Sequence, residues 1–208
     1  MYQPHPSARL SRLFAERPWQ GAHPFDAQFL FVGLDANYHP DIESSLAFES
    51  VVEYHADSVA FWKRHGVHHP FLLPGYTGDG KRFHRTFSRI GFTPAEADKV
   101  SFIELLAVPT SGRSSLVAAD LDDAHLKFLH GAMFDGRARH VFVSAGVARL
   151  MRQTGRFPQL AKTAIGDGPL PVLHADSQRT VYQHLHFSSY GKFQAQLDRE
   201  LLVIAALR

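Results

Sequence analysis

The sequence predicts an α/β protein, with a three-layer α/β/α arrangement around a mainly parallel central sheet of about four strands. Short apolar runs rich in β-branched and aromatic residues alternate along the chain with segments whose apolar residues recur every three to four positions. That alternation is typical of helices packed on a parallel sheet. The 208 residues contain no internal repeat and no long linker, so we expect a single domain over residues 1–208.

Four apolar runs are the predicted strands. The first, QFLFVG, is too short for a core helix and is apolar at consecutive positions, as strands buried on both faces are. The second contains Glu104, a carboxylate whose burial is costly unless it is paired or used. The predicted strands are residues 28–33, 100–108, 140–144 and 171–174, with a fifth extended piece at 182–187.

Apolar residues at helical spacing predict the helices. In KRFHRTFSRIG, Phe83, Phe87 and Ile90 occupy positions i, i+4 and i+7, and Gly91 provides a stop. Gly66 ends a longer predicted helix over residues 50–65. Further helices are predicted near residues 10–14, within 116–134, from 145 onward and over 192–207.

The composition narrows the chemistry. The chain has no cysteine, which removes disulfides, thiol nucleophiles and thiolate zinc sites, and no cofactor is predicted. No apolar run approaches the ~20 residues of a membrane span, and residues 1–19 lack a signal peptide's apolar segment. We therefore expect a cytoplasmic protein with no membrane partner. The formal net charge of +2 and the sequence pI of about 9.0 permit an anionic partner.

Polar side chains follow the first predicted strand at once. The chain breaks at Gly33 and then presents Asp35, Asn37, Tyr38 and His39 in quick succession. In open parallel sheets, ligands bind just beyond the carboxyl ends of the strands. The alternative is an aspartate that caps the next helix among ordinary loop residues. This segment is the main candidate site.

A second polar cluster lies in QHLHFSSYGKF, residues 183–193. His184 and His186 are two apart and share a face if the segment is a strand. Ser188 and Ser189 follow just before the last predicted helix, where hydroxyl and backbone N–H groups suit a phosphate. The structural alternative is a histidine with an internal partner and a serine cap.

In this order, these pieces resemble the uracil-DNA glycosylase superfamily over most of the chain. The resemblance implies an enzyme that hydrolyses the N-glycosidic bond of a flipped base in DNA. The matching pieces are Gly33-Leu34-Asp35 with Tyr38-His39 behind it, the helix entry Thr77-Gly78-Asp79-Gly80, the strand SFIELLAVPT, the segment VFVSAGVARLM and the motif His186-Phe187-Ser188-Ser189.

The resemblance implies two catalytic residues. Asp35 would lie beside the sugar and would orient a water molecule or stabilise the cationic sugar as the base leaves. His186 would donate a hydrogen bond to the departing base, and a preorganised donor of this kind contributes about 3 kcal/mol. In the base pocket that the resemblance implies, Phe48 would stack on the flipped base, and the lining would comprise Gly33, Leu34, Asn37, Tyr38, Phe48 and Glu104.

DNA is the partner that the resemblance implies, and no obligate protein partner is predicted. Ser188 would contact a backbone phosphate. Tyr190 stands where the family inserts an apolar wedge into the duplex, which helps because flipping a base costs a few kcal/mol. Ser189 and Lys192 complete the predicted DNA-binding segment.

Several positions depart from the family's pattern. Ala36 replaces the proline that usually follows the motif's aspartate, and Phe187 and Ser189 replace both prolines of the usual His-Pro-Ser-Pro motif. Glu104 stands near the place of the asparagine that recognises the edge of uracil. Asparagine offers a donor and an acceptor, whereas ionised glutamate offers only acceptors. The expected substrate is therefore a damaged or deaminated base that need not be uracil.

Two questions stay open at this point. Glu104 either recognises a base, which requires a proton on its carboxyl group or a base edge with two donors, or it is half of a buried pair with an arginine such as Arg113. The protein is either an enzyme or a non-catalytic nucleic-acid or nucleotide-binding protein on the same fold.

A metal-dependent hydrolase is a further alternative. His65, His68 and His69, or His184 and His186 with Asp35, are residue types that bind metals. The sequence HGVHH does not have the spacing of a zinc helix motif, and Gly66 interrupts it. We therefore expect His65, His68 and His69 on a polar surface near a turn, and no metal site is predicted.

Overall fold

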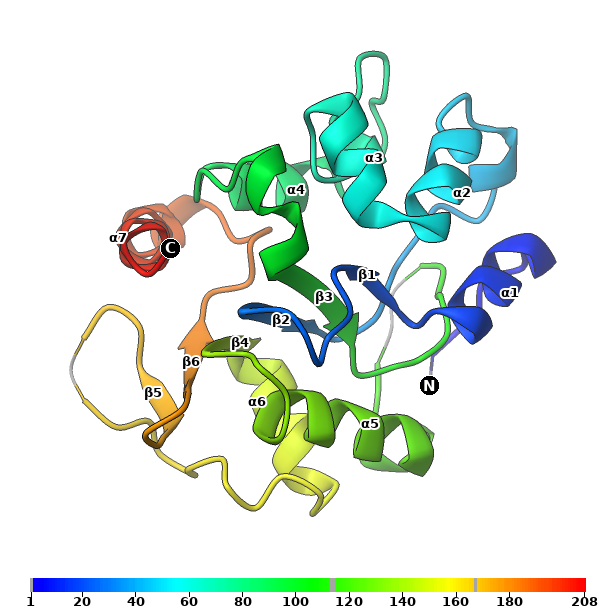
Figure 1. Ribbon diagram of the computed structural model, residues 1–208. Helices are drawn as coiled ribbons and strands as arrows, with labels where there is room; N and C mark the ends of the chain where they lie inside the picture. The colour runs from blue at the N-terminus through cyan, green and yellow to red at the C-terminus, as the bar shows by residue number, and fades with distance from the viewer. Residues whose placement is uncertain (1, 113–114, 167) are drawn as a thin grey trace.

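The protein has one mixed six-stranded sheet with helices on both sides (Figure 1). The computed structural model describes residues 2–112, 115–166 and 168–208. The strand order is β1-β3-β2-β4-β6-β5. The strands are β1 (Trp19–Gly21), β2 (Phe29–Gly33), β3 (Val100–Glu104), β4 (His140–Ser144), β5 (Val172–Ala175) and β6 (Thr180–His184).

The α/β class is confirmed, but the sheet has six strands rather than about four and is only partly parallel. The four central strands, β3, β2, β4 and β6, run parallel, while β1 and β5 pair antiparallel at the two edges. The edge strand β5 reverses because a tight turn joins it to β6, closed by the Asp176 N–H donating to the Arg179 carbonyl at 3.0 Å. The sequence WQG of β1 is too short to show a pattern.

The helices follow the predicted segments, with one division. The single helix predicted over 50–65 is two helices, because Asp57 is extended (φ −154°, ψ 92°) and its carboxylate caps the second by accepting from the Ala60 N–H at 2.9 Å. Gly66 ends that second helix at φ +72°, as predicted. The α-helices are α1 (Ala8–Glu16), α2 (Phe48–Ala56), α3 (Ser58–His65), α4 (Lys81–Ser88), α5 (Asp123–Phe134), α6 (Ala145–Gln153) and α7 (Gln194–Ala206).

Short 3-10 helices occur in the connections. They are η1 (Ile42–Ser44), η2 (Pro70–Leu72), η3 (Pro94–Lys99), η4 (Ala118–Asp120) and η5 (Gly191–Phe193). Within the described ranges, none of the helices is both long enough and apolar enough to cross a membrane.

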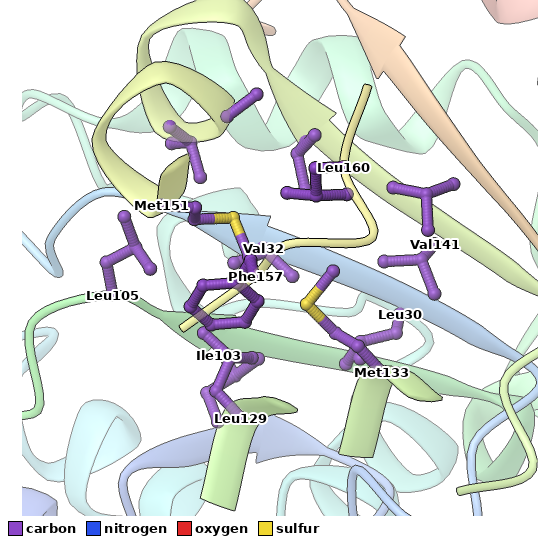
Figure 2. Close-up of a cluster of buried hydrophobic side chains, with 14 of the residues drawn as sticks. Leu30, Val32, Ile103, Leu105, Leu129, Met133, Val141, Met151, Phe157 and Leu160 are labelled. Atoms are coloured by element: carbon purple, nitrogen blue, oxygen red, sulfur yellow. The ribbon is translucent and has the colours of Figure 1, made fainter. Parts of the chain in front are cut away.

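Alternate residues of the central strands enter two separate cores. On one face, Leu30 and Val32 pack with α5 and α6, and Figure 2 shows this core around Met133, Met151 and Phe157. On the other face, the alternate residues of β2, Phe29 and Phe31, pack with α3, α4 and α7. Burial on both faces explains why the central strands read as continuous apolar runs.

The strand register places four chain segments at one end of the sheet. Gly33 at the end of β2 lies opposite Glu104 at the end of β3, and Ser144 at the end of β4 lies opposite His184 at the end of β6. The loops that leave these four parallel strands therefore begin side by side.

Candidate functional site

A cavity of about 390 Å³ lies at the carboxyl ends of the parallel strands. The last residues of β2, β3, β4 and β6, which are Gly33, Glu104, Ser144 and His184, all line it. This is where open parallel sheets place their ligands, and the volume falls in the range of small-molecule sites, roughly 300–1,000 Å³.

The cavity brings together chain segments that are far apart in the sequence. It is lined from the β2 end by five of the predicted residues, from β3 by Glu104, and from the segment after β6 by His186 and Ser188. The five from the β2 end are Gly33, Leu34, Asp35, Asn37 and Tyr38.

Phe48 is not part of the cavity lining, which corrects the stacking role expected for it. Its ring is 3% exposed and is buried in a separate cluster with Leu10 and Phe14 of α1. The Arg9 guanidinium lies over this ring, 5.2 Å from its centroid. Position 48 begins α2 and its side chain joins that helix to α1. Aromatic rings of Phe71, Phe83 and His84 line the cavity instead.

The other predicted DNA-binding residues lie just beyond the lining. Tyr190 is 67% exposed, and Arg82 of α4 stacks on its ring at 4.8 Å from the centroid. The Ser189 N–H donates to the His186 carbonyl at 2.8 Å, which closes the turn after His186. Lys192 is exposed, with its ammonium 5.2 Å from the Phe193 ring centroid.

Asp35 is held by a short relay of hydrogen bonds. The Thr110 hydroxyl donates to Asp35 Oδ2 at 2.5 Å, and the Asn37 side-chain amide donates to Thr110 Oγ1 at 3.1 Å. The same amide donates to the Gly112 carbonyl at 2.6 Å, so Asn37 joins the loop after β2 to the loop after β3. No role was predicted for Thr110, although it is the last residue of the segment SFIELLAVPT.

His186 presents a donor to the cavity. The Ser188 N–H donates to His186 Nδ1 at 3.2 Å, so a neutral ring carries its proton on Nε2. Burial lowers the pKa of His186, and the Asp35 carboxylate opposes that shift by raising it. The Asp35 carboxylate therefore lies close enough to affect the titration of His186 across the cavity, and the imidazole is neutral at pH 7.

Glu104 is poised to be protonated at neutral pH. Burial, and then the nearby Asp35 carboxylate, raise the pKa of Glu104 to about 8. Its carboxyl group rests on Gly33, where an added Cβ would lie 1.8 Å from Glu104 Oε2. Arg113, the partner considered from the sequence, lies outside the described residues. In the described part of the chain, no basic side chain forms an ion pair with Glu104.

This raised pKa makes a prediction for stability. Because the folded state holds the Glu104 proton up to about pH 8 and the unfolded chain releases it near 4.5, that contribution is present below pH 4.5 and is lost as pH rises to 8. In wild type, the free energy of unfolding should therefore be lower at pH 9 than at pH 5. Glu104→Gln should reduce this decrease by on the order of 3 kcal/mol, because glutamine has no proton to lose. Urea unfolding at both pH values measures this, with the exposed Glu16→Gln as control. If Glu104→Gln shows the same difference in unfolding free energy between pH 5 and pH 9 as wild type, Glu104 is not neutral in the folded protein.

A cluster of three histidines adjoins the cavity, and two of them, His69 and His84, are part of its lining. The rings of His69 and His84 stack with centroids 3.5 Å apart and planes 6° apart, and His68 Nε2 lies 3.1 Å from His84 Nδ1. Burial lowers the pKa of all three, that of His84 to about 3. The expectation that His68 and His69 lie on a polar surface is wrong, since they are 3% and 5% exposed. The neighbouring Pro70-Phe71 was the available signal for burial.

Two helix N-termini border the cavity. Gly80, the N-cap of α4, and Ser144, the N-cap of α6, both line it. The partial positive charge of a helix N-terminus favours negative charge nearby. Together with a neutral imidazole donor and a carboxylate, the cavity can stabilise a leaving group that gains negative charge and an electrophilic carbon that gains positive charge.

A search of protein-family models and a search of curated proteins each found no match to this chain. Over residues 2–112, 115–166 and 168–208, no group of three or more His, Asp or Glu side chains is arranged to hold a metal ion.

Proposed function

We propose that this protein is a DNA glycosylase that hydrolyses the N-glycosidic bond of a flipped, damaged or deaminated base. One observation carries the proposal: Asp35 and His186, which lie 151 residues apart (186 − 35) in the chain, line the same cavity. An acid beside the sugar and a hydrogen-bond donor beside the base are the two groups that this hydrolysis needs.

In the proposed reaction, the glycosidic electron pair leaves with the base while positive charge grows on the sugar. The Nε2–H of His186 donates to the base as its oxygen becomes negative. The Asp35 carboxylate, oriented by Thr110, stabilises the cationic sugar and accepts a proton from the attacking water. The products are the free base, which takes up a proton, and an abasic sugar that carries the water's hydroxyl group.

Glu104 is the proposed base-recognition residue. A protonated carboxyl group offers one donor and one acceptor, as the asparagine of the related family does. The structure raises the pKa of Glu104 to about 8, which supports the protonated alternative over a base edge with two donors. The proposed substrates are therefore bases whose edge has one donor beside one acceptor, a pattern that uracil and hypoxanthine share.

We also propose that the fold is the three-layer α/β/α arrangement of the uracil-DNA glycosylase superfamily. Its centre would be the four parallel strands, with β1 and β5 as additions at the edges. The two separate cores, one under α5 and α6 and the other under α3, α4 and α7, support this assignment (Figure 1).

The proposed DNA surface lies beside the cavity mouth. Ser188 and Gly80 line the cavity, and two residues beyond each of them stand Tyr190 and Arg82, in contact with each other. An exposed aromatic ring held by an arginine suits insertion into a duplex with its cation beside a phosphate. Tyr190 is the proposed wedge and Ser188 the proposed phosphate contact.

The direct test is incubation with DNA duplexes that each carry one altered base: uracil, hypoxanthine, xanthine or hydroxymethyluracil. We expect abasic sites, detected by strand cleavage after alkali, in at least one of the four. Release of none of these bases, with DNA binding retained, would contradict the proposal and favour a non-catalytic binder.

His186→Leu is expected to slow base release about 100-fold, because the departing base loses its donor. DNA affinity should change less than threefold, since the ring contacts the base only as the bond breaks. Single-turnover rates and fluorescence anisotropy on the same duplex separate the two quantities. His39→Leu, which removes an exposed imidazole outside the cavity lining, is the control. Equal losses of rate and affinity in His186→Leu would rule out this role.

A further inference from the structure

A second cavity of about 390 Å³ lies at the opposite end of the sheet. Three arginines line it, Arg137, Arg139 and Arg179, against a single carboxylate, Asp26. The side-chain amides of Gln28 and Gln178 add further donors. Gln28 precedes β2 and Arg139 precedes β4, whereas the candidate glycosylase site lies at the other ends of these strands, roughly 15 Å away at ~3.3 Å per residue.

Arg179 lines this cavity, and its largely buried side chain has an N–H group without a hydrogen-bond partner among the described residues. Its side chain is 10% exposed, and its Nη1 donates to the Met133 carbonyl in the last turn of α5 at 2.9 Å. Its Nε is buried, has no hydrogen-bond partner among the described residues, and lies 4.0 Å from Asp176 Oδ2. A buried N–H without an acceptor is costly, and an anion in the cavity would offset part of that cost by its attraction to the guanidinium charge.

Backbone hydrogen bonds fix the main chain at the other two arginines, whose side chains are exposed. The Arg137 N–H donates to the Phe25 carbonyl at 2.8 Å, and the Arg139 N–H donates to the Gln28 carbonyl at 3.0 Å. Gly136 packs so closely that an added Cβ would lie 2.6 Å from the Ala132 carbonyl oxygen. In the described part of the chain, neither Arg137 nor Arg139 forms an ion pair with an acidic side chain. The two guanidinium charges are therefore carried on a fixed backbone at the cavity edge and are not neutralised by an ion pair among the described residues.

We propose that this cavity, defined by Arg137, Arg139 and Arg179, binds a phosphate dianion, either free or as the monoester of a small sugar. Tetrahedral phosphate can accept hydrogen bonds from three guanidinium groups at once, which a planar carboxylate cannot do as well. No aromatic ring lines the cavity among the described residues, so nothing there would stack on a nucleobase. Asp26 would accept from a hydroxyl group of a sugar phosphate and would repel free phosphate.

Isothermal titration calorimetry of the full chain with inorganic phosphate, and separately with ribose 5-phosphate, tests this proposal. All titrations are made at the same ionic strength, and chloride serves as the control anion. We expect saturable one-to-one binding that the double variant Arg137→Gln, Arg139→Gln weakens at least tenfold. The matched double variant Arg12→Gln, Arg149→Gln removes two exposed charges outside the cavity and should change affinity less than twofold.

Asp26→Asn distinguishes the two sources of phosphate. It should tighten inorganic phosphate several-fold by removing a like charge, and it should tighten ribose 5-phosphate less if the carboxylate accepts from the sugar. The site is supported if either ligand binds and its affinity is weakened by Arg137→Gln, Arg139→Gln but not by Arg12→Gln, Arg149→Gln. Heats that chloride reproduces, or equal weakening by both double variants, would overturn it. The outcome does not depend on whether the protein releases bases, because the two cavities share no lining residue.

Discussion

Asp35→Asn is expected to lower the rate of base release about 10³-fold while DNA affinity stays within a few-fold. The amide keeps the size of the carboxylate and can still accept from the Thr110 hydroxyl, so the site geometry should survive. It carries no negative charge to stabilise a cationic sugar and cannot accept the water's proton, and each such loss typically costs 10²- to 10³-fold or more. Single-turnover cleavage of the best substrate duplex measures the rate.

Asp41→Asn is the matched control for this prediction. Asp41 lies six residues after Asp35 on the same connection, is exposed and does not line the cavity. The same change of charge there should alter the rate less than twofold. A rate for Asp35→Asn within tenfold of wild type would show that the carboxylate is not catalytic, and the proposal for the site would then fail.

The rate of base release should fall as pH rises through about 8, and the fall should approach tenfold per pH unit at higher pH. Above the raised pKa of Glu104, its carboxyl group loses the proton that lets it donate to the base. The ionised group also places a second negative charge beside Asp35. Glu104→Gln keeps one donor and one acceptor at every pH, so its rate should stay flat to pH 9.5 and exceed that of wild type there.

Gly33→Ala is a companion to this experiment. The new methyl group would occupy the position of Glu104 Oε2, so the flexible carboxyl group must move away from its place. We expect base release to drop at least tenfold with little change in melting temperature.

For the pH profile, one result would contradict the prediction. If Glu104→Gln shows the same fall in rate at alkaline pH as wild type, the titrating group is a different one and Glu104 does not recognise the base.

The fold class and most elements could be predicted because the central strands are apolar on both faces and the helices are amphipathic. What could not be predicted depends on short or reversed segments. The three residues of β1 carry no periodic pattern, and β5 reads as a parallel strand until the tight turn at Asp176 reverses it. Asp57 divides a periodic segment because its side chain caps the second half, an effect that periodicity alone does not reveal.

The residues of the candidate site also fall into two groups: those whose position follows from the strand ends and those whose position depends on tertiary packing. Asp35 comes just after a predicted strand and could be placed because strand ends converge in a parallel sheet. His186 was expected within an extended piece at 182–187, but β6 ends at His184 and His186 lies in the loop that follows. Phe48 could not be placed, because its position depends on how α2 packs against α1. The stacking of His84 in α4 on His69 in the preceding loop was missed, since such a pair depends on tertiary contacts that single-sequence patterns do not contain.

The stacked histidines also bear on where such a molecule can operate. His68, His69 and His84 are uncharged in the folded protein, where burial lowers their pKa values. In the unfolded chain they take up protons, because the pKa of free histidine is near 6.5. Acidification below that value therefore favours the unfolded chain, because it protonates side chains that the folded protein keeps neutral beside the cavity. Alkali acts from the other side by ionising Glu104. The two titrations therefore oppose each other, since histidine protonation favours the unfolded chain below about pH 6.5 and ionisation of Glu104 removes stability as pH rises toward 8.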